Sequence, residues 1–170
     1  LYNYYPSKRA LYEAVLDRGV SPLTKLLADY AAGPHEMDAT VKLVEAVMNH
    51  LRERPHLSRL IYLESIAEGE YLKHMAAKWF RPLTAQIVGE LRTGVVTAGI
   101  EERMFPVFAA LFMHLSFGHF SLAPLLREVF DYDPLSEAGI AQQTQLIVGL
   151  IHQMFPYLSN SKERREHGTK

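Results

Sequence analysis

The first eleven residues include several side chains that can contact phosphate groups. Tyr2 and Tyr4 carry phenol hydroxyls, and Lys8 carries an ammonium group next to a predicted helix start. Ser7 is a residue type that caps helices, and a helix N-terminus favours anions because its backbone amides are unpaired. These groups are therefore candidates for contact with a nucleic-acid backbone. A capped surface turn with aromatic packing is the competing interpretation.

Glu64 is a second candidate for a specific interaction. It follows the apolar run 60–63, so its carboxylate could point into a helical bundle. A buried carboxylate needs a partner. That partner could be a cationic ligand, one of the basic side chains Arg59, Lys73 and Arg81, or a capping backbone amide. A solvated or internally satisfied carboxylate is the favoured alternative, and His114 and Gln143 are similar candidates.

The eight histidines form no recognisable metal-binding pattern. His114 and His119 are five positions apart, which places them poorly for one face of a helix. There is no cysteine, so thiolate metal sites and disulfides are excluded. Metalloprotease motifs, glycine-rich phosphate loops and nucleophile elbows are also missing from the sequence. We expect no metal, no cofactor and no catalytic residues, so the sequence does not predict an enzyme.

The composition fits one domain with a sizeable core. The 170 residues are 48% hydrophobic and 22% charged, and the net charge is −1. Such a charge provides no domain-wide basic field, so any contact with DNA must be local. No apolar run reaches the roughly 18 residues of a membrane span. With no visible signal peptide and no cysteine, a cytoplasmic location is expected.

Glycine and proline fall between long periodic segments, a pattern that predicts an all-α helical bundle. The expected helices are residues 8–18, 22–32, 38–54, 56–66, 70–97, 103–121, 123–130 and 133–158. The first two could be one kinked helix, because Pro22 removes a backbone donor. A kink is also expected at Pro82, inside the longest segment. The polar tail, residues 159–170, is expected to be disordered.

The N-terminal run resembles a motif of the TetR/AcrR family of one-component transcription regulators. The residues on the family pattern are Leu1, Tyr2, Tyr4, Tyr5, Pro6, Ser7, Lys8, Ala10 and Leu11, with Tyr5 where Phe is commoner. The resemblance implies that the chain starts inside a DNA-recognition helix and lacks most of the helix-turn-helix before it. It assigns phosphate contacts to Tyr2, Tyr4 and Lys8. Residues 1–18 would be the remnant of the DNA-binding domain, and residues 19–158 the ligand-binding and dimerisation domain.

The resemblance also implies a ligand pocket among the central helices. The residues expected to line it are Tyr62, Glu64, Trp79, Phe80, Leu83, Ile87, Phe108, Phe112 and Met113. Their types suit a large apolar or aromatic ligand. For any one of these residues, ordinary core packing is an equally good explanation.

The two late helices, 103–121 and 133–158, are apolar around most of their circumference, so they need partners on all sides. A second copy of the chain is the expected partner, since family members pair two such helices into a four-helix bundle. The residues expected at this interface are Phe117, Gly118, Ile147, Leu150, Ile151 and Met154. A monomer core is the alternative explanation.

The resemblance implies a homodimeric, ligand-responsive DNA-binding regulator, in this family usually a repressor. Operator DNA would be released when a small, largely apolar effector enters the helical core. The helix from Lys8 to Ala32 would transmit the change. A helical small-molecule carrier or an enzyme with a buried apolar cavity is the alternative, and a helical interaction protein is a third possibility.

Overall fold

The computed structural model describes residues 4–33, 37–93 and 102–166, and these residues form helices without any strand. The expected all-α fold is confirmed. The α-helices are α1 (Lys8–Ala31), α2 (Met37–Glu53), α3 (Pro55–Ala67), α4 (Glu70–Met75), α5 (Arg81–Thr93), α6 (Phe105–Ser121), α7 (Ala123–Val129) and α8 (Glu137–Glu166). A π-helical turn, η1 (Ala76–Phe80), links α4 to α5, and a 3-10 turn, η2 (Glu102–Met104), precedes α6.

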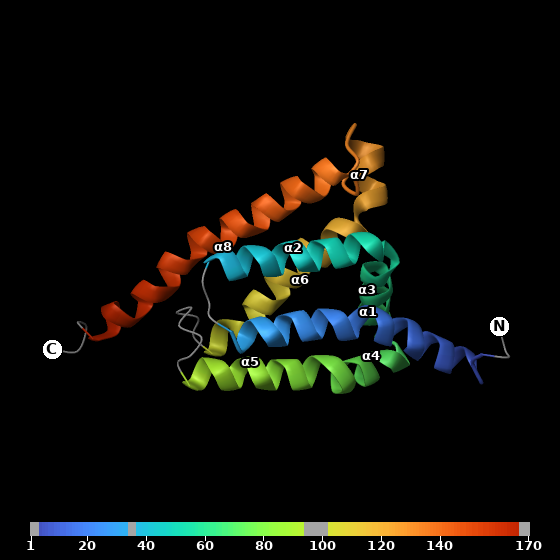
Figure 1. Cartoon of the computed structure of the whole chain (residues 1–170), viewed down its shortest axis with the longest axis horizontal. Coiled ribbons are helices and arrows are strands. Elements are labelled where there is room, and N and C mark those ends of the chain that lie inside the picture. Colours follow the sequence, from blue (N-terminus) through green and yellow to red (C-terminus); the bar gives the residue numbers. More distant parts are fainter. Residues whose placement is uncertain (1–3, 34–36, 94–101, 167–170) are drawn as a thin grey trace.

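The helices α1, α2 and α5 run side by side, and α6 crosses the bundle (Figure 1). The N-terminal end of α1 and the C-terminal end of α8 project from opposite ends of the bundle. No single helix in the described ranges is long and apolar enough to cross a membrane. The pair α6 and α7 meets the length and composition criteria only when joined across its bend of 62°.

Helix α1 is continuous over 24 residues and carries Pro22 in its interior. Ser7 caps it, because its hydroxyl accepts a hydrogen bond from the amide of Ala10 at 3.1 Å. Pro22 lies on the exposed side, so the carbonyl that loses its amide partner can be hydrated. Leu16 and Val20 before the proline and Leu23 after it are all buried, so the buried face of the helix continues past Pro22. Of the two alternatives for this region, the single helix is the one observed.

The segment expected as one helix over residues 70–97 is interrupted by η1, directly before Pro82. A π turn is one of the usual causes of a helix irregularity near proline. The helix resumes as α5 and is described as far as Thr93, so the expected end at Thr97 lies outside the described residues. At the other end of the chain, α8 continues to Glu166, through most of the tail expected to be disordered.

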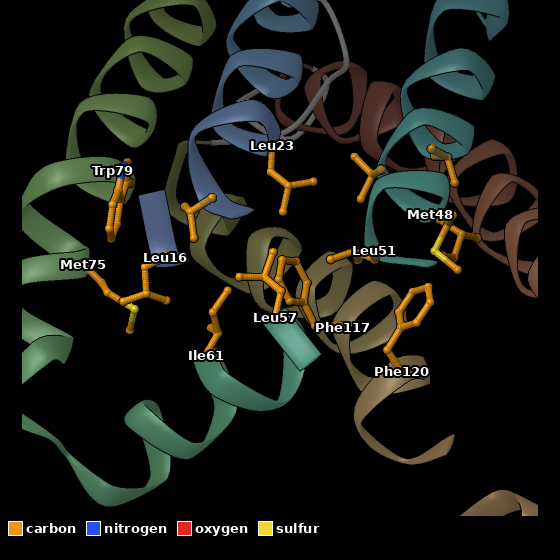
Figure 2. Close-up of a cluster of buried hydrophobic side chains, with 14 of the residues drawn as sticks. Leu16, Leu23, Met48, Leu51, Leu57, Ile61, Met75, Trp79, Phe117 and Phe120 are labelled. Carbon is orange, nitrogen blue, oxygen red and sulfur yellow. The ribbon is translucent and has the colours of Figure 1, made fainter. Parts of the chain in front are cut away.

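The core lies where α1, α2, α3, η1 and α6 meet (Figure 2). Its largest fully buried side chains are Phe120, Leu16, Met48, Leu51, Met75 and Ile147. Gly19 permits a close approach of α1 to α3, since a Cβ placed there would lie 2.5 Å from Cδ1 of Leu57. A larger residue at Gly19 would push Leu57 out of its place in this core.

The corner between α6 and α8 is held by a buried histidine. Nε2 of His119 lies 2.7 Å from the carbonyl oxygen of Pro134, which can only accept, so this nitrogen carries the hydrogen. Ser136 caps α8 by accepting from the amide of Gly139 at 3.1 Å. Because of this cap, α8 begins at Glu137 and not at the expected Asp133.

Burial lowers the pKa of His119 below its usual 6.5, although the bond to Pro134 opposes the shift. The folded chain then binds fewer protons than the unfolded chain as the pH falls through 6.5. The free energy of unfolding should therefore decrease between about pH 7.5 and about pH 5.5. Urea unfolding of the wild type and His119→Gln, which keeps an N–H donor, should show a smaller decrease in the variant. Equal decreases would contradict this contribution, because the other histidines are common to both proteins.

Candidate functional site

A cavity of about 530 Å³ lies between the helices of the bundle. Its wall is built mainly by α1, α2, α5, α6 and α8, with smaller contributions from α3, α4 and η1. This volume is within the range of pockets that hold drug-sized ligands. The cavity is therefore the candidate functional site.

The structure brings most of the expected pocket residues to this one cavity. These residues are Phe80, Leu83, Ile87, Phe108, Phe112 and Met113. They come from η1, α5 and α6, so the bundle assembles them from segments far apart in the sequence. Whether they bind a ligand stays a prediction, but their side chains do line a common space.

Three expected pocket residues lie elsewhere. Trp79 is buried in the core, and its Nε1 donates to Oδ1 of Asp17 at 3.2 Å. The hydroxyl of Tyr62 forms a 3.0 Å hydrogen bond with Nδ1 of His114, outside the cavity. The third, Glu64, is not in the cavity wall either. In each case a polar group has a partner within the chain that draws the side chain away from the cavity.

The partner of Glu64 is Tyr12 of α1, whose hydroxyl donates to Oε1 at 2.7 Å. The partners suggested by the sequence were a cationic ligand, a basic side chain or a capping amide, and Tyr12 was not among them. Burial, followed by the hydrogen bond to Glu64, raises the pKa of Tyr12. The carboxylate lies directly over Gly69, where a Cβ would collide with Oε2. Gly69 therefore leaves the space in which the bond between α1 and α3 forms.

The contribution of the first two helices to the cavity was not foreseen. Val20, Leu23 and Leu27 of α1 line it, as do Leu43 and Val47 of α2. Their helical spacing was visible in the sequence, but spacing alone indicates only an inward-facing stripe. The long-range packing decides which part of that stripe faces an open space.

The cavity wall is uncharged over the residues that the structure describes. Most of its threonine and serine hydroxyls are turned to their own helices, and that of Thr40 forms a 2.7 Å hydrogen bond with the hydroxyl of Tyr30 on α1. Thr24 donates to the carbonyl of Ser21 at 2.9 Å, and Thr84 to that of Phe80 at 2.7 Å. A charged ligand would lose its hydration here without gaining a counter-charge. The lining therefore favours a neutral and largely apolar molecule.

The comparisons with known proteins address the same region. A family model described as "Tetracyclin repressor-like, C-terminal domain" matches residues 37–151. The chain belongs to the TetR family. The nucleoid occlusion factor SlmA of Pasteurella multocida (strain Pm70) is 29% identical over 126 residues. That match covers 71% of this chain and 62% of SlmA, and no solved structure matches the chain significantly.

The described part of the N-terminal run, residues 4–11, lies at the projecting end of α1 (Figure 1). Tyr4 is 87% exposed, and Lys8 is exposed at the first position of the helix. Tyr2 lies outside the described residues. The two described side chains are thus accessible to a partner molecule, and they sit on the helix that also forms one wall of the cavity.

The residues expected at a TetR-type dimer interface are mostly enclosed within the subunit. Phe117, Gly118 and Ile147 are buried in the single chain, so they offer little or no surface to a second copy. Leu150 and Ile151 are half-buried and line the cavity. The side chain of Met154 lies outside the described residues. Neighbouring helices of the same chain cover Phe117, Gly118 and Ile147, which were expected to need a second copy.

Other residues of these TetR-type helices are exposed and apolar. Leu146 of α8 is 51% exposed, and a Cβ placed on Gly149, one turn later, would contact nothing within 4 Å. Val107 of α6 is 57% exposed.

A group of three or more metal-ligating side chains does not occur within the described ranges.

Proposed function

We propose that this chain is the ligand-binding and dimerisation part of a TetR-family transcriptional regulator, acting as a repressor in the cytoplasm. The protein would bind operator DNA as a homodimer and release it when a small molecule fills the cavity. In this proposal residues 1–18 belong to the DNA-binding part and residues 19–158 to the regulatory part. The chain does no chemistry on the molecule that it binds.

The observation that carries the proposal is the position of α1. Its N-terminal end presents Tyr4 and Lys8, and its middle forms a cavity wall through Val20, Leu23 and Leu27. A ligand that has different affinities for two positions of α1 shifts the balance between them. Such a helix can connect occupancy of the cavity to the DNA-contacting end without a separate relay.

The effector should be neutral, largely apolar and small enough for a cavity of about 530 Å³. The uncharged wall supports this class, since an ion would be desolvated without a partner. Aromatic side chains such as Phe80, Phe108 and Phe112 add ring surfaces that suit an aromatic or a polycyclic aliphatic molecule. No cofactor is needed for this function.

A second copy of the chain would pair with α6 and α8 through their exposed residues. On α8, Leu146 and Gly149 are three positions apart and share one face of the helix. The missing side chain at Gly149 leaves room for a partner helix to approach closely. We therefore move the proposed interface from the buried residues of these helices to this uncovered face.

Lys8→Ala should weaken binding to every DNA sequence alike in the natural full-length protein. The reason is that a phosphate contact carries no base information but does release one counterion. The logarithmic slope of affinity against salt should decrease by about one unit for each lysine that is replaced. Fluorescence anisotropy with a mixed-sequence duplex at several salt concentrations measures this slope. Lys42→Ala, at an exposed lysine of α2, is the control, and an unchanged slope for Lys8→Ala would remove this assignment.

A carrier for apolar molecules is the second candidate, because the same cavity would suit it. Family membership favours the regulator, and so does the name of the related SlmA, which refers to the nucleoid. From that name we take only the expectation that this protein also acts at DNA. A natural full-length protein that binds ligand without any effect on DNA binding would favour the carrier.

A further inference from the structure

One carboxylate oxygen joins α1 to the π-helical turn η1. Oδ1 of Asp17 accepts hydrogen bonds from Nε1 of Trp79 at 3.2 Å and from Oγ of Ser21 at 3.0 Å. The ammonium of Lys78 lies 2.9 Å from the same oxygen and 4.8 Å from the centroid of the Trp79 ring. These four residues are called the Asp17 joint below. Its hydrogen bonds, first that from Lys78, lower the pKa of Asp17, so the carboxylate stays charged at neutral pH.

The π turn explains how two consecutive residues reach one oxygen. In an α-helix, neighbouring side chains point about 100° apart around the axis, which follows from 3.6 residues per turn. Here the helix is a π turn with i→i+5 bonds, and both Lys78 and Trp79 reach Oδ1 of Asp17 from it. Such turns are rare in proteins and are frequent at functional sites. Figure 2 shows Trp79 and Met75 beside Leu16 of α1.

The two elements that the joint connects also form walls of the cavity. Phe80, the last residue of η1, lines it directly after Trp79 in the sequence. On α1, Val20 and Leu23 line it within two turns after Asp17. A change in the distance between α1 and η1 therefore changes the shape of the cavity.

We propose that the Asp17 joint is a positioning element that couples occupancy of the cavity to the placement of α1. This inference rests on the ligand-binding function proposed above and adds the residues that carry the signal. Asp17 does not touch the cavity, so it acts through α1 and η1.

The direction of the coupling follows from the geometry of the cavity. The cavity of about 530 Å³ is present while the joint is formed. Without the joint, α1 and η1 can approach each other, and this approach narrows the cavity. The joint and the ligand therefore stabilise each other, and a bound ligand holds the projecting end of α1 in one orientation.

Asp17→Asn tests this coupling, with Nile red as a neutral apolar probe of the cavity. The amide keeps the shape of the side chain but loses the charge that holds Lys78. The dissociation constant of Nile red should rise by about three- to tenfold, the low end of measured couplings, because the joint is partly exposed to water. Lys78→Met, which keeps the aliphatic stem, should give a rise of similar size. The double variant should add little to either single change, because both remove the same joint.

Glu13→Gln is the matched control. It removes a carboxylate from the same helix, but one that pairs with Arg9 within α1 at 3.1 Å. Nile red affinity should stay within about twofold of the wild type. An unchanged affinity in both Asp17→Asn and Lys78→Met, or an equal loss in Glu13→Gln, would overturn the coupling and leave the ligand-binding function intact. If Nile red does not bind the wild type, the ligand-binding function itself is refuted, and the coupling with it.

Discussion

Ile147→Ala is expected to lower the free energy of unfolding of the chain by about 2–5 kcal/mol. Ile147 has no exposed surface in the single subunit, where it packs in the core next to the cavity. Truncation removes packing that α2, α6 and α8 provide within one chain. Urea unfolding followed by circular dichroism measures the decrease. If the chain dimerises as proposed, the dissociation constant of the dimer, from sedimentation at several concentrations, should change by less than about twofold.

Leu146→Ala is the matched control, because it shortens the neighbouring side chain on the exposed face of α8. Leu146 is 51% exposed, so its removal should change the free energy of unfolding by only about 0.5 kcal/mol. If this face pairs with a second copy, the same change should weaken the dimer measurably. The opposite result, a weaker dimer with Ile147→Ala and no effect of Leu146→Ala, would restore the interface expected from the sequence.

Ala109→Trp should weaken Nile red binding by about tenfold or more. Ala109 lies on α6 in the cavity wall, and an indole added there occupies space that the ligand needs. Tenfold corresponds to about 1.4 kcal/mol, which is modest for the loss of a large part of an apolar pocket. Fluorescence titration with Nile red measures the affinity, and thermal unfolding shows whether the fold tolerates the larger side chain.

Ala85→Trp provides the comparison for this experiment. Ala85 is exposed on α5 and does not line the cavity, although its neighbours Leu83 and Thr84 do. Its replacement adds the same indole without filling the site, so the affinity for Nile red should stay close to that of the wild type. Equal binding by the wild type and Ala109→Trp would show that the probe binds somewhere other than the cavity.

The helices themselves could be predicted from the sequence, because proline, glycine and capping residues mark most of their ends. Pro55 opens α3 and Pro106 opens α6, as a first-turn proline should. The continuity of α1 through Pro22 was left open, since it depends on the buried stripe on either side. The buried residues of α1 are covered by α2, α3 and η1, and a local sequence pattern does not reveal these contacts.

The site was harder to predict than the fold. The apolar and aromatic residues of η1, α5 and α6 could be assigned to the cavity because they share inward faces. The internally satisfied carboxylate favoured for Glu64 is the one observed, but its partner, Tyr12, was missed because it is 52 residues away in the sequence. Trp79 was misjudged because a π turn changes which side chains share a face, and no simple residue pattern predicts that turn.

The predicted dimer residues show a second limit. Helix α6 is apolar on nearly all sides, and the sequence alone allows either a second copy or the rest of the chain to cover it. The structure shows that α3, α2 and α8 cover its C-terminal half, including Phe117 and Phe120. Burial of this kind depends on the angles and positions at which helices cross, and hydrophobic periodicity does not encode this crossing geometry.

Trp79 is the only tryptophan among the 170 residues. It lies 5% exposed at the contact between α1 and η1, with a carboxylate on its N–H, a lysine over its ring, and His74 edge-on at 6.1 Å. The tryptophan emission, excited at wavelengths where the nine tyrosines do not absorb, therefore originates from one indole at one contact. Its wavelength and quantum yield should respond to the charges beside it, so the unlabelled protein carries its own optical sensor of how α1 is seated.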